Sequence, residues 1–421
     1  MKKILFILPI AVLFINCSKK SSTISFGGVE YDRSFFDSAY QMPLGKSSPT
    51  MINLNDPFSI ESPTNVVGKT FDFSTLIDSY ELIFLETIDS SMIGEVSRVI
   101  RKDHFIFVLD SKKSNRLFVF DNSGKFIRNI GAPGNGPGEY YEASDFDYDY
   151  KKGVIYIWDN YKTTIYEYDT LGIFLSKRKV PVLSMYFTRV GEEFIFQNIL
   201  GNNHSKMLSN HALCIGTEKK PISKVCLPIL KYNFISDRIS RINDSTALFT
   251  KPYNDTIYHY RKGQIFAEYV FNFPNSTRLP DDHMIKSNCD YDRFKSLFPR
   301  SKYTYFDYGC WESSNYLITQ IVYKDIPYTI YFNKRTGALH IGNKTLNSSD
   351  RLERMLVFSN PISVCDDCFI TPVYFPFFIP DIQVFFRDYS ASEKKSLFRK
   401  YPQFEHWNQE SNPILCFIKY K

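Results

Sequence analysis

The sequence lacks the short motifs that identify most hydrolases, kinases and nucleotide-binding proteins. It contains no HExxH, no GxSxG, no P-loop and no protein-kinase signature. Its seven histidines are scattered along the chain and do not cluster. Local motifs therefore predict no catalytic residue and no cofactor. An enzyme whose acidic residues come from different repeats would leave no such motif.

The chain also lacks a large excess of charge of either sign. It carries 51 Lys and Arg residues against 45 Asp and Glu residues, a formal net charge of +6 over 421 residues. Because a nucleic-acid groove requires a concentrated basic face, we expect no nucleic-acid partner. Beyond the N-terminal leader there is no run of 18 or more apolar residues, so no transmembrane helix is expected.

The N-terminus has the features of a bacterial export signal. Lys2 and Lys3 precede an apolar run of about 12 residues, which is too short for a permanent membrane helix. The residues LFINC, ending at Cys17, resemble a lipoprotein cleavage site, which predicts removal of residues 1–16 and acylation of Cys17. The acyl chains would anchor the protein in the cell envelope, in the outer membrane, with its periplasmic or surface orientation left open. An ordinary cleaved signal with an incidental cysteine is the alternative.

Seven cysteines follow Cys17, and an odd number in an oxidising compartment leaves at least one unpaired. Cys365 and Cys368 form the one CxxC pair. A structural zinc site usually needs a second such pair, and a thioredoxin-like site needs a βαβ context. We therefore interpret residues 365–368 as a turn between two strands, with free thiols or a local disulfide, and predict no metal there.

What the sequence does contain is a strand pattern that occurs twice in succession. FIFVLD at Phe105–Asp110 recurs as VIYIWD at Val154–Asp159, an offset of about 49 residues, and the strands that follow recur at about 48. Alternating apolar and polar residues predict half-buried strands, and a repeat of about this length is typical of propeller blades. The aromatic fraction of 17 % also suits β-structure.

The repeat predicts an all-β fold, a six-bladed β-propeller over residues 71–421. Five blades follow from the spacing, with a short helical insert expected at about 281–300. The sixth blade must combine residues 80–87 with the strand that ends the chain, because an unclosed blade would expose a sheet edge. Residues 17–70 are rich in Ser, Pro, Gly and Asn, which predicts a flexible tether.

Several segments resemble the six-bladed β-propeller lipoproteins of Gram-negative anaerobes, which are related in pattern to NHL-repeat propellers. The segments are FLETIDSSMIGEV (84–96), FVFDNSGKFIRNIGAPGNGPGEY (118–140), KPYNDTIYHY (251–260), YFNKRTG (331–337) and the terminal NPILCFIKYK. The resemblance covers the chain from about residue 71 to the end and implies the propeller fold. About function it implies little beyond an association with glycan uptake.

Asp110 and Asp159 recur at the end of the second strand of the first two blades. This recurrence favours a structural role such as capping a turn. Loops on one face of a propeller are also where ligands bind, so Asp110, Trp158, Asp159 and Asn160 are candidate ligand-binding residues. In this hypothesis Trp158 would stack on a sugar; the alternative is that Trp158 belongs to the core.

Two further patterns have a structural and a functional interpretation. Asp145, Asp147 and Asp149 alternate along a predicted strand and would share one face, facing solvent or the central channel. Calcium binding by these three oxygen ligands is the weaker alternative. The glycine-rich residues 131–138 lack the spacing and the context of a phosphate-binding loop, so we interpret them as a turn between blades.

Together these patterns predict a monomeric, lipid-anchored propeller that serves as a binding or scaffold module of the cell envelope. The expected partner is a glycan or an envelope protein, besides the membrane that holds the lipid. A propeller-type glycan hydrolase or lyase, with acids contributed by several blades, is the alternative.

Overall fold

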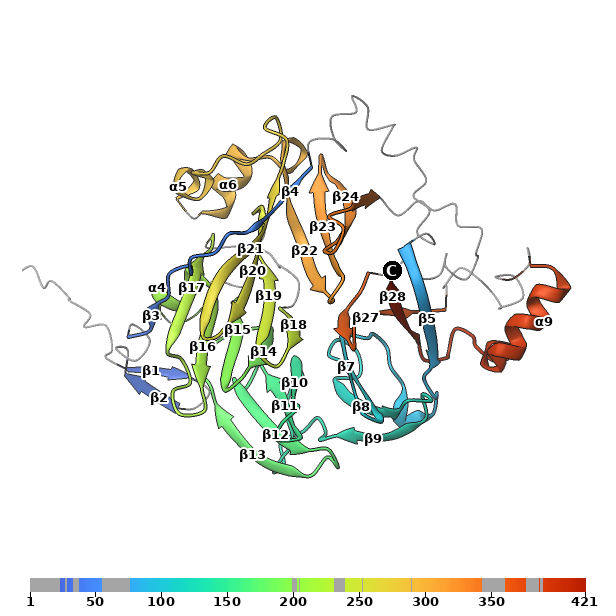
Figure 1. Ribbon diagram of the computed structural model, residues 1–421. Helices are drawn as coiled ribbons and strands as arrows, with labels where there is room; N and C mark the ends of the chain where they lie inside the picture. The colour runs from blue at the N-terminus through green and yellow to red at the C-terminus, as the bar shows by residue number, and fades with distance from the viewer. Residues whose placement is uncertain are drawn as a thin grey trace, which may run out of the picture.

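The computed structural model describes residues 23–26, 29–32, 38–54, 76–198, 203, 205–230, 239–251, 253–288, 290–342, 360–375, 386 and 389–421. Within these residues, six sheets of four or five strands stand around a common axis as the blades of a propeller (Figure 1). This confirms the predicted all-β, six-bladed fold. None of the described helices is long and apolar enough to cross a membrane.

The first three blades follow the chain in order, with the first strand of each blade innermost. Blade 1 contains β6 (Arg98–Lys102), β7 (Phe105–Asp110), β8 (Arg116–Asp121) and β9 (Phe126–Ile130). Blade 2 contains β10 (Asp145–Asp149), β11 (Val154–Asp159), β12 (Thr164–Asp169) and β13 (Phe174–Lys179). Blade 3 contains β14 (Tyr186–Val190), β15 (Glu193–Gln197), β16 (His211–Thr217) and β17 (Lys224–Pro228), with the short helix α4 (Lys206–Ser209) before β16.

The remaining blades include the ends of the chain. Blade 4 contains β18 (Ser240–Asn243), β19 (Thr246–Thr250), β20 (Thr256–Arg261) and β21 (Gln264–Asn272). Blade 5 contains β22 (Thr304–Glu312), β23 (Tyr316–Tyr323), β24 (Ile326–Asn333) and β25 (Leu339–Gly342). Blade 6 contains β26 (Ser363–Cys365), β27 (Cys368–Val373), β28 (Ile414–Tyr420) and β5 (Ile77–Phe84).

The middle strands of a blade are apolar on both faces because each blade packs between two others. Strand β7 (FIFVLD) is buried at every position after its first, whereas the outer strand β13 (FLSKRK) is exposed at three of its six positions. A separate apolar cluster fills each of the six junctions between neighbouring blades. The core is therefore a ring of six interfaces, each made of side chains from two blades.

The ring closes by pairing the two ends of the domain, as predicted. Strand β28 lies between β27 and β5 and pairs antiparallel with both. The side chain of Asn412, just before β28, accepts a hydrogen bond from the Ile93 amide and donates to the carbonyls of Glu86 and Ser91, each at 2.8 Å. Blade 6 is thus held by one C-terminal and one N-terminal strand, joined at their ends by a buried amide.

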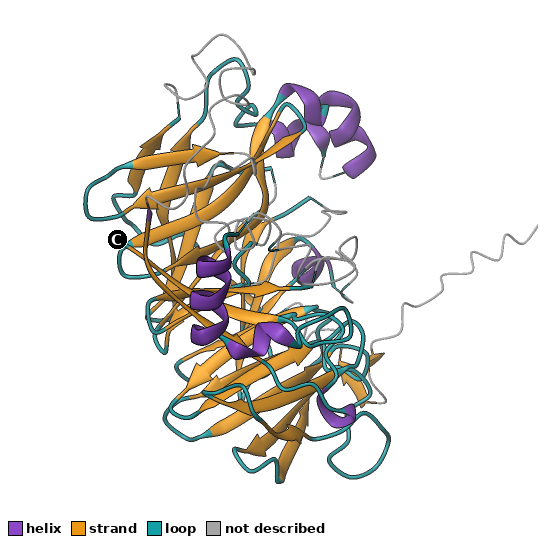
Figure 2. Cartoon of the chain, turned by 90° about the vertical axis from the view of Figure 1, so that its right-hand side faces the viewer, coloured by secondary structure: helices purple, strands orange, loops and turns teal. Residues whose placement is uncertain are grey.

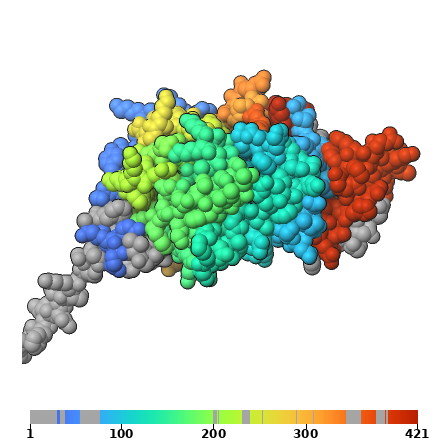
Figure 3. Space-filling view, turned by 90° about the horizontal axis from the view of Figure 1, so that it is seen from below, coloured from blue at the N-terminus to red at the C-terminus, as the bar shows by residue number. Residues whose placement is uncertain are grey.

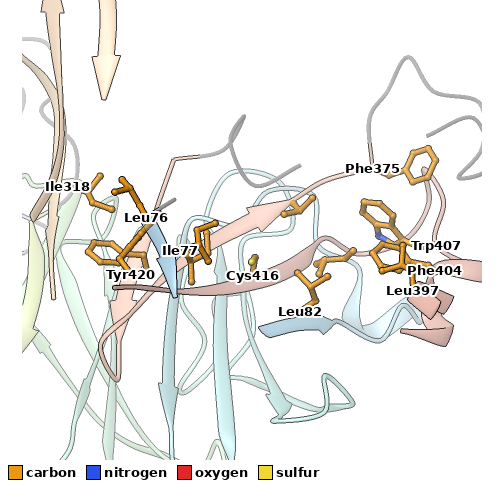
Figure 4. Packing of buried hydrophobic residues seen from close by; sticks show 14 of the residues in the cluster. Leu76, Ile77, Leu82, Ile318, Phe375, Leu397, Phe404, Trp407, Cys416 and Tyr420 are labelled. Carbon is orange, nitrogen blue, oxygen red and sulfur yellow. The ribbon is translucent and has the colours of Figure 1, made fainter. Parts of the chain in front are cut away.

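Helical segments lie at the periphery of the strands (Figure 2). Helices α5 (His283–Ser287) and α6 (Tyr291–Leu297), followed by η3 (Arg300–Lys302), form the predicted insert before blade 5. Helix α9 (Ala391–Lys400) begins at a capping box of Ser390 and Glu393 and is followed by η4 (Pro402–Glu405). Leu397, Phe404 and Trp407 from this region pack beside Phe375 and extend the core of blade 6 outward (Figure 4).

The predicted tether of residues 17–70 is wrong for the segment 38–54. Strand β3 (Tyr40–Gln41) pairs in parallel with β17, and β4 (Thr50–Asn53) pairs in parallel with β21. The N-terminal segment lies against the outer rim of blades 3 and 4 (Figure 3). By pairing with β17 and β21, this extended segment covers two sheet edges that would otherwise be open. A hairpin of β1 (Thr23–Phe26) and β2 (Val29–Asp32) precedes it, and the rest of the predicted tether lies outside the described residues.

Replacing Asn412 by alanine should destabilise the closed ring. The change removes three hydrogen bonds at a side chain that is 2 % exposed and leaves their backbone partners unpaired, so we expect the free energy of unfolding to fall by about 2–4 kcal/mol. Urea unfolding measures the loss. Glu410→Ala, at an exposed position two residues earlier, is the matched control, and an equal effect of both changes would contradict the role of Asn412.

Candidate functional site

Two pockets lie at opposite ends of the inner strands. The first, which we call the loop mouth, has a volume of about 450 Å³ and is bordered by Glu95, Ser97, Lys112, Glu142 and Met185. These residues precede the inner strands or follow the second strands of their blades. The second, the turn mouth, has a volume of about 490 Å³ and lies where β6, β18 and β26 end.

The two pockets share part of their walls. Trp311 of β22 and Ile362, just before β26, line both of them. The indole of Trp311 is 8 % exposed, so most of its surface is packed against protein. These two side chains therefore separate the loop mouth from the turn mouth at the centre of the ring.

The alternating carboxylates of β10 join blade 2 to blade 3. Asp145 accepts a hydrogen bond from the backbone amide of Phe187 at 3.1 Å, and Asp147 accepts one from the amide of Arg189 at 2.7 Å. The amides belong to β14 and, like the carboxylates, are two residues apart. Side chains thus satisfy backbone donors on the inner edge of β14 that no strand pairs with, which a buried edge requires.

Arginines from three blades neutralise these carboxylates. Arg98 of blade 1 contacts Asp145 at 3.2 Å, and Arg241 of blade 4 contacts Asp147 at 2.7 Å. Arg189 of blade 3 pairs with Asp149. Each of these side chains is at most 9 % exposed. The ion pairs therefore connect blades 1 to 4 beneath the surface of the ring.

The charge of Asp147 is strongly favoured by its surroundings. Burial by itself would raise the pKa of this carboxyl group. The guanidinium groups of Arg241 and Arg98 outweigh burial and, together with two hydrogen bonds, lower the pKa of Asp147 to about 2. The carboxylate is thus ionised throughout the physiological range.

The structure corrects the interpretation of Asp145, Asp147 and Asp149. They share one side of an inner strand as predicted. Of the two surroundings expected for that side, solvent is excluded because all three are buried, whereas the ion pairs with arginines of blades 1 and 4 agree with the central channel. Their oxygens already accept hydrogen bonds from guanidinium and amide groups. The calcium alternative is not supported, and no group of three or more potential metal ligands occurs among the described residues.

Asp110 organises the turn that follows β7. Its carboxylate accepts hydrogen bonds from the amides of Lys113 at 2.8 Å and Ser114 at 3.1 Å within the turn, and from Gly94 at 2.8 Å in the loop before blade 1. Burial would raise the pKa of Asp110, but these amide donors outweigh burial and lower it. The residue ties an inter-blade loop to a turn, which is the structural role that its recurrence predicts.

Asp159 likewise joins a turn to an inter-blade loop in blade 2. It accepts a hydrogen bond from the Lys162 amide at 2.8 Å in the turn and from the Tyr141 amide at 2.7 Å in the preceding inter-blade loop. Asn160 connects further, since its side chain accepts from the Ser184 amide at 2.9 Å. Asp110 and Asp159 are both fully buried, so neither carboxylate is available to a ligand.

Trp158 is a core residue. Its ring is 0 % exposed and packs against Phe187 and Phe196 of blade 3. Its Nε1 donates to the carbonyl of Ser184 at 2.5 Å. The sugar-stacking role does not agree with this burial, because no face of the indole is open to solvent.

The structure brings a different pair of acids to the loop mouth. Glu95 and Glu142 both border this pocket, and both stand three residues before an inner strand. They are 47 residues apart, which is close to the repeat of about 48 residues. That spacing was a usable signal in the sequence. It was missed because the residues lie in loops and not in the strands from which the repeat was read.

The two remaining patterns are turns, as predicted. The glycine-rich residues 131–138 connect β9 to β10, and a side chain at Gly138 (φ 73°) would collide with Phe174 at 2.7 Å. Cys365 and Cys368 face each other across the hairpin of β26 and β27 and are free thiols. Burial raises the pKa of Cys365 to about 12, so this thiol is not a ready nucleophile.

An Asp147→Asn substitution should destabilise the ring and should do so most at neutral pH. The variant removes the carboxylate that Arg98 and Arg241 share in a buried site. Because Arg98 keeps Asp145 and Arg241 keeps Asp244, the expected cost is about 2–3 kcal/mol, below the range for a buried charge left without any partner. Because the folded pKa is depressed, the stability that the carboxylate contributes is complete above the ordinary value of 3.8 and is lost as pH falls towards about 2.

Urea unfolding at steps from pH 7 to pH 2 measures both effects. The difference between wild type and Asp147→Asn should narrow between pH 4 and pH 2. Asp103→Asn, at an exposed carboxylate, is the control and should track the wild type. A difference that stays constant across this range would show that the buried charge is not the cause.

A comparison with curated proteins finds no match. Among solved structures, one described as an exported protein of Bacteroides fragilis matches with a TM-score of 0.66 and 19 % identity, over 89 % of this chain and 100 % of its own. A member of the DUF4221 family from Bacteroides vulgatus matches with a TM-score of 0.45 and 10 % identity, over 82 % of this chain and 97 % of its own. At these identities the first likeness shows the fold alone.

The family described as "domain of unknown function (DUF4934)" matches residues 58–419, from before β5 to the last strand of blade 6. The match covers all six blades. The chain therefore belongs to the DUF4934 family.

Proposed function

We propose that this protein is an exported, lipid-anchored module of the cell envelope that binds a ligand or partner at its loop mouth. The observation that carries the proposal is the pocket itself. It opens among loops from blades 1, 2, 3 and 6 and ends on Trp311, and it combines acidic, basic, hydroxyl and apolar side chains. Concave sites of this size and mixed lining are where proteins bind small or extended ligands.

The walls of the pocket are pre-organised. Asp110 and Asp159 tie the loops that carry Glu95 and Glu142 to the adjacent turns. Beneath them, the ion pairs of β10 hold four blades in register. A rigid scaffold that presents loops at one face is the arrangement in which loop residues bind ligands without a cost of ordering.

Export and anchoring rest on the N-terminal signal, with Cys17 as the acylated residue; Cys17 lies outside the described residues. The likeness to a protein described as exported agrees with this location. An outer-membrane anchor leaves the propeller free as a monomer on either membrane face. Association with glycan uptake, which the sequence resemblance implies, makes a glycan or an envelope protein the partner to test.

Acylation of Cys17 is tested by labelling cells with an alkyne fatty acid. The full chain should be labelled and should sediment with membranes, because several acyl chains suffice for stable anchoring. Cys17→Ala should lose the label and leave the membrane fraction, whereas Cys310→Ala, which alters a buried thiol of β22, should keep it. Label that persists in Cys17→Ala would contradict the lipid anchor.

Binding at the loop mouth is tested by thermal unfolding in the presence of soluble glycans, nucleotides, and Ca²⁺ with and without EDTA. A ligand at 100 times its Kd stabilises the folded state by about 2.7 kcal/mol. Met185→Arg places a long charged side chain in the mouth and should abolish the shift. Ile285→Arg is the control, because Ile285 lies on α5 and is 82 % exposed. A shift that survives Met185→Arg would place the ligand elsewhere.

The same incubations address the alternative of a glycan hydrolase or lyase. Glu95 and Glu142 border one pocket, and paired carboxylates are what glycoside hydrolysis requires. New reducing ends that disappear in the double variant Glu95→Gln, Glu142→Gln would favour this alternative over a module that only binds.

A further inference from the structure

Two tyrosines stand exposed beside the loop mouth. Tyr141 is 50 % exposed and Tyr161 is 68 % exposed, although both are large rings. Their ring centroids are 4.3 Å apart at an interplanar angle of 30°. Tyr141 directly precedes Glu142, which borders the pocket. The pair therefore forms an aromatic surface that continues the wall of the loop mouth outward.

Both tyrosines are held by their backbones. The amide of Tyr141 donates to Asp159, and its carbonyl accepts from the Asn115 side chain at 2.8 Å. Tyr161 lies in the turn between β11 and β12, whose following residue, Lys162, is fixed to the same Asp159. One buried carboxylate thus fixes the backbone at both tyrosines, so the loop and the turn that carry the rings do not have to be ordered when a ligand covers them.

Polar groups of both kinds surround the rings. The Nζ of Lys162 lies 6.0 Å from the centroid of the Tyr141 ring and donates to the Asn135 side chain at 2.8 Å. Asn135 is exposed at the tip of the glycine-rich loop. Donors and acceptors therefore border an apolar surface. Charges of both signs lie near it: Glu139 and Glu142 are acidic, Lys162 is basic, and Glu95 and Lys112 of the loop mouth pair with each other.

This combination defines the chemistry of the ligand. A pyranose ring offers a face of C–H bonds that packs on an aromatic ring, and hydroxyl groups at its edge that donate and accept hydrogen bonds. The near balance of charge fits a neutral ligand better than a polyanion, because a polyanion would need a basic surface. We propose that Tyr141 and Tyr161 form a subsite for a neutral saccharide, with the amide of Asn135 and the ammonium group of Lys162 bonding its hydroxyl groups. The inference rests on the proposed binding function of the loop mouth and names the ligand class.

Affinity electrophoresis of the full chain, purified in detergent, tests the subsite. The probes are a soluble glucan, mannan, xylan and arabinan, with polygalacturonate as the anionic comparison. We expect at least one neutral polysaccharide to retard the wild type. The double variant Tyr141→Ala, Tyr161→Ala should weaken its apparent Kd by about tenfold or more, because stacking and buried ring area are both lost.

Two further variants make the result specific. Tyr161→Phe keeps the ring and should retain binding. Tyr40→Ala removes an equally exposed tyrosine on β3, 59 % exposed and on the outer edge of blade 3, and should also leave binding unchanged. Thermal unfolding without a probe shows whether each variant is folded.

Three outcomes overturn the inference. A neutral polysaccharide that binds equally to the double alanine variant would overturn the subsite but keep the loop mouth as a binding site, provided Met185→Arg abolishes that binding. Retardation by polygalacturonate alone would overturn the neutral class. Retardation by none of the five probes would overturn a saccharide ligand, while a thermal shift with another ligand that Met185→Arg removes would leave the proposed function intact.

Discussion

The rest of the structure depends on the closure of the ring by β28 and β5. A propeller blade can bury its two faces only if it has a neighbour on each side, so all six apolar junctions require a complete circle. The sixth sheet is assembled from strands that are more than 300 residues apart in the chain. Because the last junctions form only when both ends have met, contacts at the seam such as those of Asn412 bear on the stability of every blade.

A second constraint is that the innermost and outermost strands of each blade have backbone groups that no neighbouring strand of the blade pairs with. On the inside, carboxylates of β10 accept hydrogen bonds from backbone amides of β14, and arginines from three blades balance the negative charge of these carboxylates. On the outside, β3 and β4 cover the edges of blades 3 and 4. Both solutions give buried or edge-lying backbone groups their partners, and the inner one also makes the walls of the pockets rigid.

The proposed function depends on the side chains that these rigid loops expose at the loop mouth. The carboxylates of the two recurrent aspartates, Asp110 and Asp159, are occupied by hydrogen bonds to backbone amides of turns and loops. Partly or fully exposed side chains lie just beside them: Glu142, the two tyrosines, and Glu95, which pairs with Lys112. The repeated aspartates therefore have the same structural role in both blades. The residues whose amides they bind differ between the blades, Gly94 in one and Tyr141 in the other, and this difference places an exposed aromatic ring in blade 2 only.

The sequence alone determined most of the blade strands, the number of blades and the closure, because these depend on local alternation of apolar and polar residues and on the repeat period. It also determined the helical insert and the capping role of the recurrent aspartates. It did not predict β18, whose four residues SRIN show no apolar alternation, or the pairing of residues 40–53, because parallel addition to an edge needs no pattern of its own. Only the tertiary structure decided that Trp158 is buried while Tyr141 and Tyr161 are exposed. Exposure depends on which neighbouring blade covers a ring, and that neighbour is distant in the sequence.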